Sequence, residues 1–185
     1  MKHLFLLVLP LILAGCIALK PPVKSNELDA SGRAAFLSAI NTKRSGAATI
    51  SCVGGGVLKY QDPETYTGAS PDLTWNAKLE AAALNNASFL ASSDFNIATG
   101  DPHNSAGNGN IAARVLSTGY NMSSAGETIA RGQSTPDAVA QDWQISSNAH
   151  CNIMLDKTMK DIGAASVTSP SGQKYWVMVV GRVQP

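Results

Sequence analysis

The 185-residue chain carries 14 lysine and arginine residues against 13 aspartate and glutamate residues, so its formal net charge is only +1. Nucleic acids and anionic membrane surfaces are bound by strongly basic faces, and this balance argues against both as partners. Apolar residues make up 44% of the chain and charged residues only 15%, so a single domain with a sizeable core is expected.

The N-terminal segment has the composition of a bacterial leader peptide. A lysine precedes the apolar run 4–13, which is too short to span a bilayer with margin. The tetrapeptide LAGC at 13–16 resembles the lipobox, whose cysteine is diacylated. We therefore expect residues 1–15 to be a signal peptide and lipid-modified Cys16 to tether the exported protein to the cell envelope. Ile17 favours the outer membrane if the cell is Gram-negative. The alternative is a short signal-anchor helix with an incidental cysteine.

Residues 16–25 contain two prolines and two lysines without periodicity and are interpreted as a tether. Residues 26–185 are then the folded domain. Its first predicted helix has apolar residues at 28, 36, 37 and 40, with Asn26 available as the N-cap. Residues 45–71 form a long loop rich in glycine, threonine and proline, which must be pinned if the domain is compact.

The strongest helical pattern covers residues 73–93. Its apolar stripe includes Leu79, Ala82 and Leu90, and Asn86 interrupts this stripe. Asn86 is open to two interpretations: a core amide satisfied by the backbone, or a sign that this face borders a polar cleft.

The second half of the chain mixes helices and strands. A short helix is expected between N-cap Asn110 and Gly119, and a longer one begins at N-cap Thr135. Residues 125–132 look extended, and residues 161–168 and 174–183 flank a turn and predict a hairpin. This order indicates an α+β domain with helices covering an antiparallel sheet.

Three tryptophans, at 75, 143 and 176, lie inside these element patterns and are expected in the core. Ser105 lacks a G-x-S-x-G context and is a poor candidate for a nucleophile.

Two cysteines, Cys52 and Cys151, remain once Cys16 is assigned to the lipid. In an oxidising compartment such a pair usually forms a disulfide, here expected to stabilise the fold by about 4–5 kcal/mol. A zinc site and a reactive thiol are the alternatives, although no C-x-x-C spacing supports zinc binding through sulfur.

Four motifs occur in a fixed order: LTWNAKLEAAA from 73, His103 followed by Arg114 and a GY pair, GETIARG from 126, and HCNIM from 150. Together, over roughly residues 33–181, they resemble the CAP domain of cysteine-rich secretory proteins, antigen 5 and plant pathogenesis-related protein 1. The resemblance implies an α-β-α sandwich, with an antiparallel sheet flanked by helices. It also supports the Cys52–Cys151 bond, because exported bacterial members carry a similar cysteine pair.

The CAP resemblance further implies a cleft with two histidines and two acids. Matching the motifs assigns His103, Glu127 and His150, while the position of the second acid is Ser146, which leaves a triad. These three residues are our candidates both for metal ligation and for catalysis.

Three functions are compatible with such a cleft. The triad could bind a divalent cation such as zinc, beside a small-molecule or lipid ligand. Alternatively, Glu127 could activate water while a histidine acts as acid or base, giving a metal-assisted hydrolase of peptide or cell-wall material. Finally, the triad could be a vestigial polar network in a structural protein that contacts an envelope or host protein. The resemblance favours a binding protein over an enzyme.

Overall fold

The computed structural model describes residues 25–45, 50–52, 65–66, 70–105, 107–146 and 149–185. The predicted signal peptide, Cys16 and nearly all of the tether lie outside these residues, and most of the predicted loop 45–71 does too. In the part that is described, no helix is both long enough and apolar enough to cross a bilayer.

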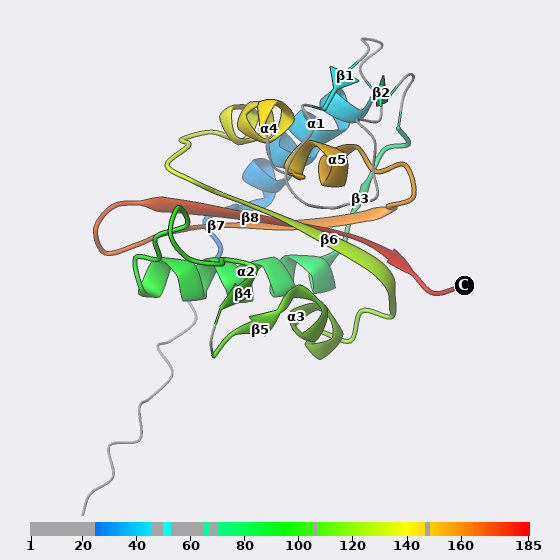
Figure 1. Ribbon diagram of the computed structural model, residues 1–185. Coiled ribbons are helices and arrows are strands. Elements are labelled where there is room, and N and C mark those ends of the chain that lie inside the picture. Colours follow the sequence, from blue (N-terminus) through cyan, green and yellow to red (C-terminus); the bar gives the residue numbers. More distant parts are fainter. Residues whose placement is uncertain (1–24, 46–49, 53–64, 67–69, 106, 147–148) are drawn as a thin grey trace, which may run out of the picture.

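The described residues form three layers, with a four-stranded sheet in the middle (Figure 1). Helices α1 (Ala30–Ser45), α4 (Pro136–Ile145) and α5 (His150–Leu155) cover one face. Helices α2 (Ala77–Ser92) and α3 (Ile111–Ser117) lie on the other. The predicted α-β-α sandwich is therefore confirmed.

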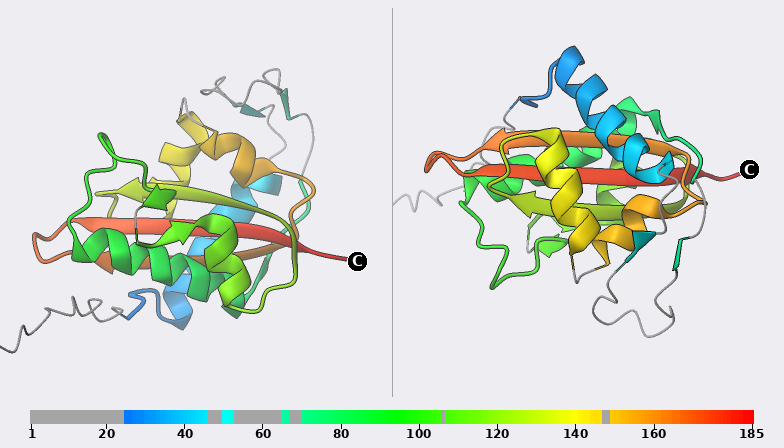
Figure 2. Two further views of the ribbon diagram at one scale, coloured as in Figure 1. Left: turned by 60° about the horizontal axis from the view of Figure 1, so that its bottom comes forward. Right: turned by 90° about the horizontal axis from the view of Figure 1, so that it is seen from above.

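The sheet has the strand order β3–β7–β8–β6. Strands β7 (Asp161–Thr168) and β8 (Lys174–Val183) form the predicted hairpin, and β6 (Met122–Arg131) pairs antiparallel with β8. The two-residue strand β3 (Thr74–Trp75) runs parallel to β7, so the sheet is mixed at that edge. At the other edge, β6 is the outermost of the described strands (Figure 2).

Two short hairpin-like pairs lie outside this sheet. Strands β1 (Ile50–Ser51) and β2 (Thr65–Tyr66) pair within the predicted loop, and β4 (Asn104–Ser105) pairs with β5 (Gly109–Asn110). Two-residue strands are too short to carry a periodicity, so no pattern in the sequence indicates them.

Alternating side chains of the sheet build a core on each face. Phe36 of α1 contacts the rings of Trp143 and Trp176, with centroids 6.1 and 6.0 Å away. These two tryptophans are almost fully buried, as predicted, whereas Trp75 is half-buried and donates its indole N–H to Glu80.

Helix α2 lies directly on β7 at Gly163. A Cβ atom at this position would overlap the backbone of Leu79 and Glu80. Only glycine allows the helix to approach so closely, and this approach sets the height of α2 above the sheet.

The N-cap predicted at Asn26 is wrong. Helix α1 begins at Ala30, and the Asp29 carboxylate accepts from the backbone N–H of Gly32 at 2.7 Å. Asn26 instead accepts from the N–H of Ser166 and donates to the carbonyl of Ala164, both at 3.0 Å. Its amide complements the backbone of β7, which is a long-range contact that helix signals cannot indicate.

The predicted N-caps of the two later helices are confirmed. The Asn110 side chain accepts from the N–H of Ala113 at 2.9 Å, and the Thr135 hydroxyl accepts from the N–H of Ala138 at 3.2 Å. Each satisfies a backbone donor that the first helical turn leaves free.

The predicted disulfide joins Cys52 to Cys151, with 5.5 Å between the Cα atoms. It links the segment after α1 to the start of α5 across 99 residues. Closing so long a loop restricts the unfolded chain by about 4–5 kcal/mol in the chain-entropy description.

Candidate functional site

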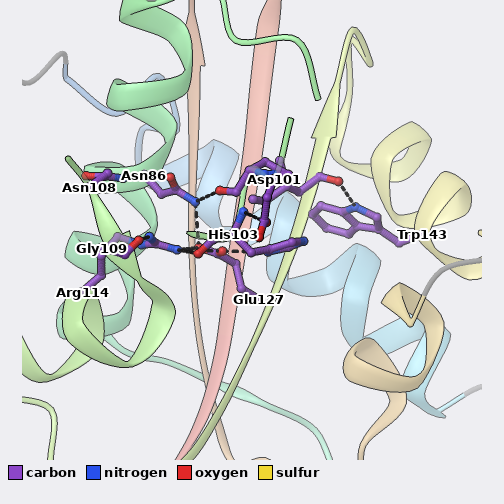
Figure 3. A network of polar contacts seen from close by, with 10 residues as sticks. Asn86, Asp101, His103, Asn108, Gly109, Arg114, Glu127 and Trp143 are labelled. Carbon is purple, nitrogen blue, oxygen red and sulfur yellow. Dashed lines mark hydrogen bonds and ion pairs between the residues drawn. The ribbon is translucent and has the colours of Figure 1, made fainter. Parts of the chain in front are cut away.

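A buried polar network is centred on Glu127 of β6 (Figure 3). Arg114 of α3 places its Nη2 atom 2.8 and 2.9 Å from the two carboxylate oxygens. The Asn86 amide of α2 donates to Oε2 at 3.0 Å, and the Nδ1 atom of His103 lies 2.9 Å from Oε1. The Arg114 and Glu127 side chains are 3% and 2% exposed, so this ion pair is withdrawn from water.

The same network fixes the loop that carries His103. Asn86 donates to the carbonyl of Pro102 at 3.2 Å and accepts from Asn108 at 2.9 Å. Arg114 donates to the carbonyls of Gly109 and His103 at 2.6 and 3.2 Å. Asn86 therefore combines both sequence interpretations, because its amide satisfies backbone and also borders the functional carboxylate.

Glu127 determines how His103 presents its ring. A carboxylate in its ionised form only accepts hydrogen bonds, so this contact calls for the His103 tautomer that carries its proton on Nδ1. In the neutral ring this leaves the lone pair on Nε2, and the side chain is 40% exposed. Pairs of this kind orient metal-binding histidines in many proteins.

His150, the first residue of α5, lies across the cleft from His103. The two ring centroids are 6.5 Å apart. Burial, and to a smaller extent the neighbouring His103, lowers the pKa of His150 from 6.5 to about 4. At neutral pH this imidazole is therefore uncharged and has a lone pair.

Helix α5 holds His150 in place although the helix has only six residues and no side-chain N-cap. The disulfide at Cys151 fixes its start. At its end, the buried guanidinium of Arg44 donates to the carbonyls of Met154 and Asp156 at 2.7 and 3.1 Å. The helix also packs closely on β6, because Ile153 occupies the space that a Cβ atom on Gly126 would need.

Both histidines line a cleft of about 540 Å³, within the size range of small-molecule sites. The remaining lining is mostly apolar, and its aliphatic members come from both sides of β6. They are Ile97, Pro102, Ile111, Ala125, Ile129, Ala149 and Ile153.

The structure thus brings together His103, Glu127 and His150, the three residues that the motifs assigned to the cleft. Among the residues it describes, however, no three histidine, cysteine, aspartate or glutamate side chains are grouped so that they could share one metal ion. The Glu127 oxygens face Arg114, Asn86 and His103. Ligation and catalysis by the triad therefore stay predictions. The position of the second acid, Ser146, follows the end of α4.

Arg114 is the functional residue that sequence reasoning missed. The motif that contains it does not indicate its contact with Glu127. The available signal in the sequence was an arginine within a short helix of otherwise mostly apolar residues. In the structure this arginine is buried, and a buried arginine requires a partner.

Comparison with known proteins places the fold in a family. The family model described as CAP, the cysteine-rich secretory protein family, matches residues 37–180. The chain belongs to the CAP family. A search of curated proteins by sequence finds no significant match.

Several solved CAP-like structures share the fold. An outer surface protein of Borrelia burgdorferi aligns with a TM-score of 0.54 and 16% identity over 62% of this chain and 80% of its own. An extracellular SCP-domain protein of Bacillus anthracis aligns with a TM-score of 0.51 and 21% identity over 61% of this chain and 34% of its own. NaASP2, solved with Zn²⁺, aligns with a TM-score of 0.52 and 15% identity over 88% of this chain and 85% of its own.

Proposed function

We propose that this CAP domain is exported, anchored by lipid at Cys16, and binds a divalent cation such as zinc through His103 and His150. A small or lipid ligand occupies the apolar remainder of the cleft. The observation that carries the proposal is the contact of Glu127 with His103 Nδ1, which leaves Nε2 free beside a neutral His150.

The donor set suits zinc, because neutral imidazole nitrogen is a preferred ligand of this ion. A zinc ion about 2.1 Å from one nitrogen of each ring would hold the centroids roughly 5.3 Å apart in a tetrahedral site and about 6.5 Å apart in a linear one. The observed separation is 6.5 Å. Binding therefore requires the rings to approach each other by roughly 1 Å in the tetrahedral case. Two protein ligands leave open positions for water or for a ligand group.

The environment of Glu127 favours binding over hydrolysis. Arg114 contacts both of its oxygens, and Asn86 and His103 contact one each, so the acceptor positions of the carboxylate are already occupied and it is poorly placed to take a proton from water. We therefore assign Glu127 the task of orienting His103 and do not count it among the metal ligands.

Two further observations support the proposal. NaASP2 has the same fold and was solved with Zn²⁺. The two bacterial proteins of this fold are an outer surface protein and an extracellular protein, which agrees with the leader and the LAGC tetrapeptide of this chain.

Calorimetric titration with zinc tests the site. The wild-type chain should bind one zinc ion, and both His103→Ala and His150→Ala should abolish the signal. Glu127→Gln should weaken binding by about 10–100-fold without abolishing it, as for other residues that orient a ligand. Equal isotherms for the wild type and the two histidine variants would contradict the proposal of a cation site at these histidines.

Lipid anchoring is tested separately by radiolabelled palmitate in a bacterial host. The wild-type chain should incorporate label and partition with membranes, whereas Cys16→Ser should do neither. Cys52→Ser serves as the control for replacing a cysteine outside the LAGC tetrapeptide and should still incorporate label, and label on Cys16→Ser would contradict the anchor.

A further inference from the structure

We infer that the cleft binds an extended peptide, which adds a strand to the free edge of β6. This inference names a ligand class for the cleft of the proposed function, and it rests on that function for the location of the site only. Pairing with β6 needs no cation.

The hydrogen-bond register of β6 determines which of its backbone groups face outward. Gly132, just beyond the last paired residue of β6, donates its N–H to the carbonyl of Lys174 at 2.8 Å. Residues that bond to the partner strand alternate with residues that do not. Positions 126, 128 and 130 therefore bond to β8, and positions 125, 127 and 129 turn their N–H and C=O groups away from it.

A second contact supports this assignment. The indole N–H of Trp143 donates to the carbonyl of Ile129 at 3.3 Å, which requires that carbonyl to face away from β8. Trp143 therefore occupies one end of the edge. Within the described part of the chain, no hydrogen bond reaches the outward backbone groups of Ala125 and Glu127.

Ala125, Gly126, Glu127 and Ile129 all contribute to the lining of the cleft, and Ala125 is half-buried whereas Glu127 is 4% exposed. Buried or half-buried backbone groups usually have partners, and an unpaired edge is a template for another strand. An extended peptide supplies the matching donors and acceptors, as in other proteins that bind peptides by strand addition.

The two walls of the cleft explain why a peptide fits better than a second folded copy. Ile97 and Ile111 stand on the α2–α3 side of β6, and Ile153 stands on the α5 side. The edge lies between these two walls, so a partner strand has to enter between them as a single chain, whereas the β6 edge of another copy would bring its own walls. Side chains of the added strand would alternate between the walls, so apolar residues at alternate positions are expected.

Peptide binding is tested on the purified full chain with a pooled library of capped hexapeptides. In these probes valine, isoleucine, leucine or phenylalanine alternates with threonine or serine. We expect at least one pool to bind and to slow hydrogen exchange at the amides of Ala125 and Glu127 in heteronuclear NMR spectra. N-methylation removes the backbone N–H of a peptide residue. Methylating the alternate residues that face β6 should abolish binding, and methylating the other alternate set should not.

Ala125→Pro is the decisive variant, because proline removes the outward N–H without removing a bond to β8. It should bind the pool at least about tenfold more weakly, as expected when a hydrogen bond is lost and close approach is blocked. Ala125→Ser keeps the N–H and should bind like the wild type. Equal thermal stability and equal zinc binding of the two variants would show that fold and cation site are intact.

Failure of every pool to bind at millimolar concentration would overturn the peptide site and leave the zinc result standing. Undiminished binding by a folded Ala125→Pro variant would also overturn it. A concentration-dependent dimer that protects the same amides would assign the edge to a second copy and contradict the inference.

Discussion

Replacing Arg114 by methionine should destabilise the domain by about 3–5 kcal/mol, because it leaves a buried carboxylate without its cation. Arg114 and Glu127 are 3% and 2% exposed, and the guanidinium contacts both carboxylate oxygens. Charges about 4 Å apart attract by about 4 kcal/mol at the effective dielectric constant of such sites, which agrees with that range. Methionine preserves the apolar stem, so the loss reports the charge together with the hydrogen bonds to the Gly109 and His103 carbonyls.

The assay is reversible urea unfolding at neutral pH with the disulfide intact. For a chain of this length the loss corresponds to a fall in melting temperature of about 6–20 °C. The matched control is Arg114→Met with Glu127→Gln, which removes both charges and should recover most of the loss. A cost below about 1 kcal/mol for Arg114→Met, or a double variant as unstable as the single one, would refute the reasoning.

Three further predictions follow from the contacts around the site and the core. Because the folded pKa of His150 is about 4 and the unfolded one 6.5, its contribution to stability is complete above pH 6.5 and is lost as the pH falls towards 4. The stability difference between wild type and His150→Gln should therefore shrink over that window, and a constant difference would contradict the burial of the ring. Gly163→Ala should cost at least about 3 kcal/mol in urea unfolding, since its methyl group overlaps the backbone of α2; a cost within about 1 kcal/mol would contradict this approach. Cys52→Ser should lower stability by about 2–5 kcal/mol and also weaken zinc binding, because the disulfide fixes the start of the helix that carries His150. Unchanged zinc affinity would show that the disulfide does not position His150.

Local signals in the sequence predicted the parts of the fold that depend on near neighbours. The N-caps Asn110 and Thr135 and the turn before Lys174 each depend on residues a few positions away. The disulfide followed from there being only two candidate cysteines for the bridge.

Elements that depend on distant residues were missed or shortened. Helix α5 has no side-chain hydrogen bond at its N-cap, and it is held by the disulfide at Cys151 and by Arg44 from more than 100 residues away. Strand β6 begins at Met122, three residues before the extended segment predicted at 125–132, because Met122, Ser123 and Ser124 show no alternating pattern. Asn26 resembles an N-cap because it precedes an apolar helical pattern, but its side chain bonds to the backbone of β7.

The candidate site shows the same division. Family motifs brought His103, Glu127 and His150 to notice, and the structure places them at one cleft. The roles of Asn86 and Arg114 depend on which groups face Glu127 across three elements. No periodicity in the sequence reports that geometry.

The tautomer of His103 tests the central claim most directly. Long-range nitrogen–proton NMR correlations on ¹⁵N-labelled protein at neutral pH distinguish the protonated ring nitrogen from the bare one. We predict a proton on Nδ1 and a bare Nε2, whose resonance shifts when zinc is added. A proton on Nε2, with Nδ1 bare, would show that Glu127 does not orient this ring and would contradict the account.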